Sequence, residues 1–214
     1  MIPTRLQSEI AKSKDDLRAL AERIGPAPES VSEVLAGLRS DQARIRYGCL
    51  KMLRLLSERQ PAVVYPHFET IAALLDSDRT ILKWGAILIM GHLAAVDSEN
   101  RIDAMLEDYL RPVSGPVLIT AANTIQGAGE IARAKPYLAD RVVRAFLEVE
   151  QAKYETPECR NVALGHVLKS MGRLFHHVKD PRPVIDFAKR QLSNRRSAVQ
   201  KEARAFLKRH GKPD

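Results

Sequence analysis

Several residue types that mark particular protein classes are scarce in this sequence. Aromatic residues make up only 5% of the 214 residues, and there are two cysteines, Cys49 and Cys159. Two cysteines cannot form the disulfide framework of a small secreted domain. The longest apolar stretch, residues 81–96, contains Lys83 and His92 and is shorter than the roughly 20 residues that a membrane span needs. We therefore expect no membrane span, and the scarcity of aromatic residues favours an all-helical protein.

Motifs that carry chemistry are also missing. The six histidines include no pair three or four residues apart, and there is no CxxC pair, so we expect no metal site. Gly127 and Gly129 lack the spacing of a dinucleotide-binding loop. The first residues lack the apolar core of a signal peptide, which favours a cytoplasmic location. We predict a protein that is not an enzyme and uses no cofactor or small-molecule substrate.

One helical pattern recurs five times along the chain. In each copy an apolar residue is followed by small or large apolar residues at offsets of four, eight and, in most copies, eleven. These offsets fall within about 80° on a helical wheel, so each copy predicts one apolar stripe along a helix. A leucine seven residues before four of the copies ends a preceding amphipathic helix. The copies start at Ile45, Leu82, Val117, Cys159 and Val199, at intervals of 37, 35, 42 and 40 residues.

The first two copies, residues 38–56 and 75–93, resemble the HEAT repeat. Each has a first helix that ends in Leu, a short turn with Asp, and a second helix that starts with an apolar and a basic residue. The third copy has Leu118 at the basic position, and residues 151–156 are inserted between the helices of the fourth. The resemblance implies an all-α, right-handed α-α superhelix, or α-solenoid. We expect a single domain over residues 1–214, with an N-terminal helix in 1–24, a linker over 25–28 and five helical pairs in 29–211.

The basic charge is unevenly distributed. The chain has 34 Lys and Arg against 26 Asp and Glu, a net charge of +8, which suggests an anionic partner. The five predicted second helices together carry +12 and the first helices −3, with +6 in the last second helix alone. In a HEAT solenoid the second helices line the concave face. The basic last helix is interpreted either as a solvated cap or as a binding surface for an anion.

We predict a scaffold that binds a protein or peptide partner with acidic segments in its concave groove. Residues opposite the apolar stripe would supply apolar anchors, amides for the peptide backbone, and cations for acidic side chains. The alternative is binding of a nucleic-acid phosphate backbone by the basic second helices. HEAT-like DNA glycosylases hold damaged DNA in their concave groove with aromatic residues and an acidic residue, but here Leu88 stands one turn after the single tryptophan, Trp84, in place of a carboxylate. The expected partner-binding residues are Tyr47, Leu50, Lys51, Arg54, Trp84, Leu88, Asn123, Gln126, Asn161, Lys201, Arg204 and Lys208.

Overall fold

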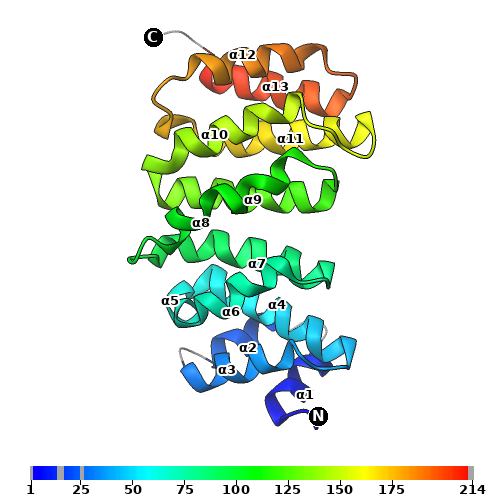
Figure 1. Cartoon of the computed structure of the whole chain (residues 1–214), viewed down its shortest axis with the longest axis vertical. Helices are drawn as coiled ribbons and strands as arrows, with labels where there is room; N and C mark the ends of the chain where they lie inside the picture. The colour runs from blue at the N-terminus through cyan, green and yellow to red at the C-terminus, as the bar shows by residue number, and fades with distance from the viewer. Residues whose placement is uncertain (1, 14–16, 25–26, 212–214) are drawn as a thin grey trace. The chain divides into compact units, whose positions relative to one another are not determined.

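A computed structural model describes residues 2–13, 17–24 and 27–211, and the secondary structure in these ranges is entirely helical (Figure 1). The chain divides into two compact units, Met1–Ser98 and Glu99–Asp214. Each unit is described by itself below. No helix among the described residues is long and apolar enough to cross a membrane.

Over its described residues, the first unit contains seven α-helices with short 3-10 segments between them. Its long helices are α4 and α7, which correspond to the predicted second helices of the first two repeats. The intervening first helix is split into short pieces because Pro66 lacks an amide hydrogen and cannot continue a regular helix. The helices are α1 (Arg5–Lys12), α2 (Leu17–Ile24), α3 (Pro28–Gly37), α4 (Ala43–Arg59), α5 (Pro61–Val64), α6 (Phe68–Ala72) and α7 (Thr80–Leu93).

The expected single N-terminal helix is wrong, because the structure has two helices there. Helix α1 ends at Lys12, and the next residue, Ser13, has a non-helical ψ of 88°. The Ser13 side chain and amide both donate to the carbonyl oxygen of Glu9, at 2.9 Å each, which closes the last turn. In the predicted linker, Gly25 and Pro26 lie outside the described residues, and Ala27 is the N-cap of α3.

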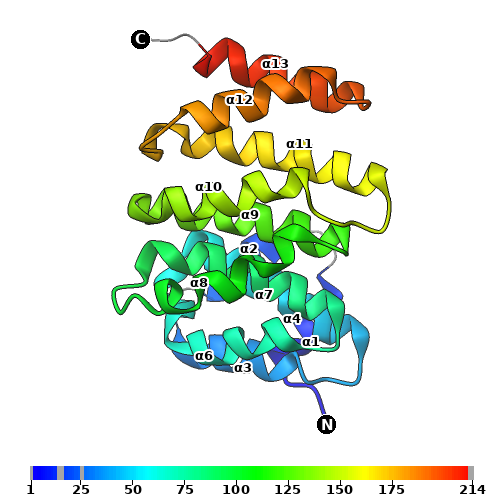
Figure 2. The same ribbon diagram turned by 45° about the horizontal axis from the view of Figure 1, so that its top comes forward.

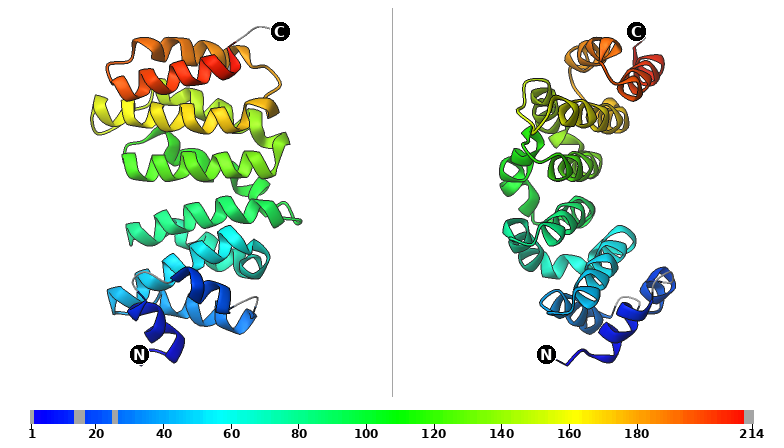
Figure 3. Two further views of the ribbon diagram at one scale, coloured as in Figure 1. Left: turned by 180° about the vertical axis from the view of Figure 1, so that it is seen from behind. Right: turned by 90° about the vertical axis from the view of Figure 1, so that its right-hand side faces the viewer.

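The second unit, as far as it is described, consists of three helical pairs in two layers. Helices α8, α10 and α12 form one layer of this unit, and α9, α11 and α13 form the other (Figure 2; Figure 3, right). The insertion predicted before the fourth second helix is present, since α11 begins at Pro157 with the Thr156 side chain as its N-cap. The helices are α8 (Arg101–Leu110), α9 (Leu118–Ala134), α10 (Ala139–Leu147), α11 (Pro157–Leu174), α12 (Arg182–Arg190) and α13 (Ser197–His210).

Most residues of the repeated pattern lie in the core of the two units. All four pattern residues of the first copy, from Ile45 to Leu56, are buried, and so are those of the second, from Leu82 to Leu93. In the third copy the first pattern residue, Val117, is 40% exposed because it precedes α9, while the other three are buried. In the last two copies Ala163, Val167, Val199 and Ala203 are buried, whereas Cys159 and Leu207 are only half-buried. The apolar periodicity therefore predicted most of the buried stripe of each second helix, and it was wrong at Val117, Cys159 and Leu207.

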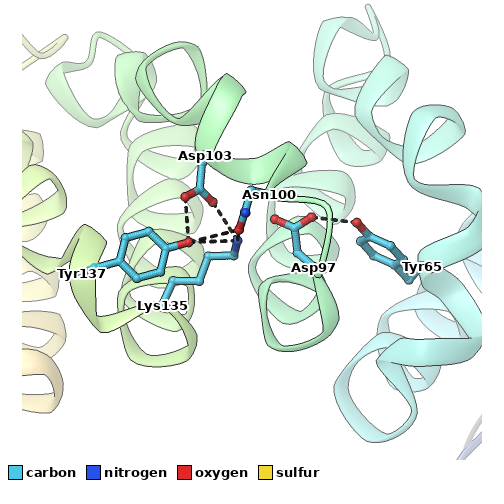
Figure 4. Close-up of polar contacts among 6 residues, drawn as sticks. All are labelled: Tyr65, Asp97, Asn100, Asp103, Lys135 and Tyr137. Atoms are coloured by element: carbon cyan, nitrogen blue, oxygen red, sulfur yellow. Dashed lines mark hydrogen bonds and ion pairs between the residues drawn. The ribbon is translucent and has the colours of Figure 1, made fainter.

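Buried polar groups tie loops to helix ends in each unit (Figure 4). In the first, Tyr65 donates to the carboxylate of the buried Asp97 at 2.7 Å. In the second, Lys135 is only 5% exposed, and its ammonium donates to Asn100 at 2.8 Å and Asp103 at 2.7 Å. These contacts fix the start of α8 to the end of α9, and they satisfy a cation whose burial would otherwise cost several kcal/mol.

Candidate functional site

Helices α4 and α7 of the first unit run in the same direction and in register. A side-chain carbon added at Gly85 would collide with Leu50, and the Ser57 hydroxyl lies 2.9 Å from His92 Nδ1. Both contacts join residues 35 apart in the sequence. A constant offset between two contacting helices means that they are parallel. The positions of side chains around α4 and α7 can therefore be compared directly.

Four of the predicted site residues lie on one side of this helix pair. In α4, Tyr47, Lys51 and Arg54 fall within about 60° of one another on the helical wheel, next to the direction of Leu50. In α7, Trp84 precedes Gly85, whose position faces α4. In two parallel helices that face each other through Leu50 and Gly85, the residue after Leu50 and the residue before Gly85 point to the same side of the pair. Lys51 and Trp84 therefore lie on the same side. We call these four residues the α4–α7 face.

The α4–α7 face combines free cations with aromatic rings. Lys51 and Arg54 are exposed and form no ion pair with any described residue. Tyr47 and Trp84 are half-buried. The guanidinium of Arg46 lies 4.8 Å from the centre of the Tyr47 ring and donates to the Ser40 carbonyl at 2.7 Å. A cation over the ring fixes the orientation of Tyr47.

Two expected apolar anchors are not available to a partner. Leu50 and Leu88 are each only 5% exposed. Leu50 is buried because it fills the space left by the missing side chain of Gly85. The sequence analysis predicted that both residues line the groove. Helices α4 and α7 approach so closely that Leu50 is instead part of the core.

Sequence reasoning missed Arg44 on the same face of α4. It lies three residues before Tyr47, is exposed, and pairs with no described acidic residue. Residues three apart on a helix lie on one side of it, so the periodicity that selected Tyr47 also selects this position. It was overlooked because the repeated pattern begins at Ile45.

The predicted amide positions in the second unit are less suited to binding. Asn123 donates to the Ile119 carbonyl of its own helix at 3.0 Å. The carbonyl of the Asn161 side chain accepts a hydrogen bond from Asn194 at 3.1 Å, so this amide is already engaged within the unit. The Gln126 side chain is exposed and makes no hydrogen bond to the described residues. Of the three predicted amides on α9 and α11, only that of Gln126 is therefore free. We call the side of α9 and α11 that carries Asn123, Gln126 and Asn161 the α9–α11 surface.

Charges on this surface of the second unit largely neutralise one another. Glu130 pairs with Arg133 at 2.8 Å and with Arg173 at 3.6 Å. Lys169 lies 3.7 Å from Glu202 of the neighbouring helix. These pairs leave little uncompensated charge for an acidic partner, in contrast to Lys51 and Arg54 of the first unit.

The three predicted C-terminal cations are exposed on one face of α13. Val199 and Phe206 point toward α11, because side-chain carbons added at Gly165 and Gly172 would lie 3.5 and 3.7 Å from them. Lys201, Arg204 and Lys208 lie on the opposite side of the helical wheel from these buried residues. They are therefore turned away from α11 and do not share a surface with the α9 and α11 amides.

The described residues contain no cluster of three or more metal-ligating side chains. Burial raises the pKa of the Cys49 thiol to about 12, so at neutral pH it stays protonated and is a poor nucleophile. Burial and the nearby Lys169 lower the pKa of His166, which keeps its imidazole neutral at pH 7.

Comparison with known proteins identifies the fold. No protein-family model and no curated protein matches the chain. Solved structures of repeat proteins do match. An engineered protein from the Northeast Structural Genomics Consortium is 13% identical, with 96% of each chain covered and a TM-score of 0.50. The designed armadillo repeat protein YIII(Dq)4CqI is 14% identical, with 94% of this chain and 97% of that chain covered and a TM-score of 0.52.

A third similar structure contains a peptide. It is the designed armadillo repeat protein YIII(Dq.V1)4CPAF in complex with peptide (KR)4, at 12% identity, with 96% of this chain and 99% of that chain covered and a TM-score of 0.53. At these identities the likeness concerns the fold. The chain has an armadillo/HEAT-like α-solenoid fold, which confirms the fold class and the resemblance seen in the sequence.

Proposed function

We propose that this protein is a non-enzymatic repeat scaffold that binds an acidic peptide segment of a partner protein on the α4–α7 face. One observation carries the proposal: two exposed cations without ion partners stand beside two half-buried aromatic rings on one side of a parallel helix pair. Aromatic and arginine side chains are enriched at the centres of protein interfaces, where they supply most of the binding energy.

The positive charge of the α4–α7 face determines which class of peptide it would bind. A designed armadillo repeat protein of similar fold forms a complex with a peptide of alternating Lys and Arg. The α4–α7 face carries Lys51 and Arg54, and Arg44 lies one turn away on the same helix. Such a face repels a basic peptide and attracts Asp and Glu, with the guanidinium able to form two parallel hydrogen bonds to a carboxylate. We therefore expect this protein to bind acidic peptides in preference to (KR)4.

The direct test compares two labelled octapeptides, (DE)4 and (KR)4, by fluorescence anisotropy at low salt. The wild-type protein should bind (DE)4 and not (KR)4. In the double variant Lys51→Glu/Arg54→Glu, affinity for (DE)4 should fall about tenfold or more, because each attractive contact becomes repulsive.

The matched control is Lys12→Glu/Arg18→Glu, which reverses two exposed cations of the same unit on α1 and α2. This variant has the same net charge as the first and should keep wild-type affinity. Equal loss in both variants, or no binding of (DE)4 by the wild type, would show that the α4–α7 face is not the site.

Trp84 provides a second readout because it is the only tryptophan in the chain. A peptide that lies on the α4–α7 face should change the intensity or wavelength of its emission during the titration. An anisotropy increase without any change in Trp84 emission would place the peptide elsewhere.

A further inference from the structure

The C-terminal helix carries cations that the structure does not neutralise. From Arg195 to Arg209 there are six Lys and Arg residues and one acidic residue, Glu202. Arg196 pairs with Glu158, and Glu202 lies beside Lys169 of α11. Among the described residues, five cations of this segment have no ion partner: Arg195, Lys201, Arg204, Lys208 and Arg209.

Three of these cations form a row along one face of α13. Lys201, Arg204 and Lys208 lie opposite Val199 and Phe206, the residues that pack toward α11. With a rise of 1.5 Å per residue, the row is about 10.5 Å long. We call these three residues the α13 end face.

A helix face that only contacts solvent needs polar residues, but these need not all carry the same charge. The neighbouring helix α12 has charges of both signs on its exposed side, with Lys189 paired to Asp186 at 3.4 Å. On α13, like charges three and four residues apart repel one another, which weakens a helix. An anion bound across Lys201, Arg204 and Lys208 would remove this repulsion, so the arrangement favours an anionic ligand.

The chemistry of the α13 end face selects the class of anion. The row contains no aromatic ring on which an unpaired base could stack and no apolar side chain to anchor a peptide or enter a lipid layer. Duplex nucleic acid offers one strand phosphate per 3.4 Å of axis, so a row of about 10.5 Å spans about three base pairs. We propose that the α13 end face binds the phosphate backbone of double-stranded nucleic acid without reading its sequence.

The test measures binding of a labelled random-sequence 20-base-pair DNA duplex at 50 and 200 mM salt. Three phosphate contacts predict a slope of about −2.7 in log affinity against log salt, or roughly 40-fold weaker binding at the higher concentration. Lys201→Glu/Arg204→Glu/Lys208→Glu should weaken binding at 50 mM by at least about tenfold. No binding by the wild type at 50 mM would overturn the proposal.

The matched control is Arg144→Glu/Lys153→Glu/Lys179→Glu. It reverses three exposed cations of the same unit that lie on other elements, so both triple variants have the same net charge. The control should bind the duplex within about twofold of the wild type, and circular dichroism should show that both variants are folded. Equal loss in the two variants would mean that only net charge matters and would refute the site.

Two further measurements distinguish duplex binding at α13 from membrane binding and from peptide binding at the α4–α7 face. Tighter binding of phosphatidylserine vesicles than of the duplex, lost in the α13 variant, would assign the α13 end face to a membrane surface and overturn the proposal. The α13 variant should still bind (DE)4, and Lys51→Glu/Arg54→Glu should still bind the duplex. Failure of one proposal is therefore distinguishable from failure of the other.

Discussion

The close approach of α4 and α7 can be tested at Gly85. In Gly85→Ala the new methyl carbon would lie 2.7 Å from Leu50 Cγ and 2.8 Å from its Cδ2. Both distances are shorter than carbon atoms tolerate, and Cγ is the branch point of the side chain. Leu50 is buried, so the whole side chain must move against its neighbours.

Two opposing effects set the size of the change. Overpacking of a core costs about 1–3 kcal/mol. Replacing Gly by Ala inside a helix gains about 0.5–1 kcal/mol through backbone entropy and propensity. We expect Gly85→Ala to lower the free energy of unfolding by about 1–2 kcal/mol. Gly165→Ala is the control, because its methyl would lie at an ordinary 3.5 Å from Val199 and only the gain should remain.

The assay is urea unfolding followed by circular dichroism, with a double-mutant cycle. Leu50→Ala alone should cost about 2–5 kcal/mol through loss of buried volume. In the Gly85→Ala background the same truncation should cost about 1–2 kcal/mol less, because it also relieves the collision. A coupling energy within about 0.5 kcal/mol of zero, or a Gly85→Ala protein as stable as Gly165→Ala, would refute the proposed packing of Leu50.

Three further predictions concern other parts of the chain. Lys135→Ala should lower the free energy of unfolding by about 3 kcal/mol in urea titrations, because it leaves the Asp103 carboxylate without its buried cation. Ala163→Leu should cost about 1–3 kcal/mol in the same assay, since this position is fully buried between helices. Because burial raises the pKa of Cys49 to about 12, at pH 8 a disulfide reagent should modify the half-exposed Cys159 first. Between about pH 9 and 12 the unfolded chain releases the Cys49 proton and the folded one retains it, so stability should fall with rising pH, less steeply in Cys49→Ala.

Much of the fold follows from local patterns. Small and apolar residues at the repeated offsets predicted most of the buried stripe of each second helix, because a helix brings such residues to one side wherever it packs. The insertion of residues 151–156 before α11 was also predicted, since it breaks the repeated pattern within the sequence itself. The break after Lys12 was missed because a serine ends a helix only when its side chain turns back to the backbone.

The candidate site depends on contacts between helices, and there the sequence alone is insufficient. Leu50 has the position of a groove residue on its own helix, and only the neighbouring Gly85 makes it core. The repeated pattern predicts that the Asn161 side chain is available to a peptide, but Asn194, in the turn before α13, donates a hydrogen bond to it. Burial and pairing are decided by residues about 35 positions away in each case, at distances that the period of a single helix does not encode.

The sequence by itself determined that the chain is helical and repetitive, that its second helices taken together are basic, and most of the stripe that each second helix buries. These properties depend on residues within a few turns of one another. Only the tertiary structure decided which basic residues have an ion partner and on which surface each of them lies. It places Lys51 and Arg54 beside aromatic rings, neutralises Lys169 with Glu202, and turns Lys201 and Lys208 away from α11. The physical reason is that the field of a charge depends on the side chains and solvent around it, which are set by how neighbouring helices pack.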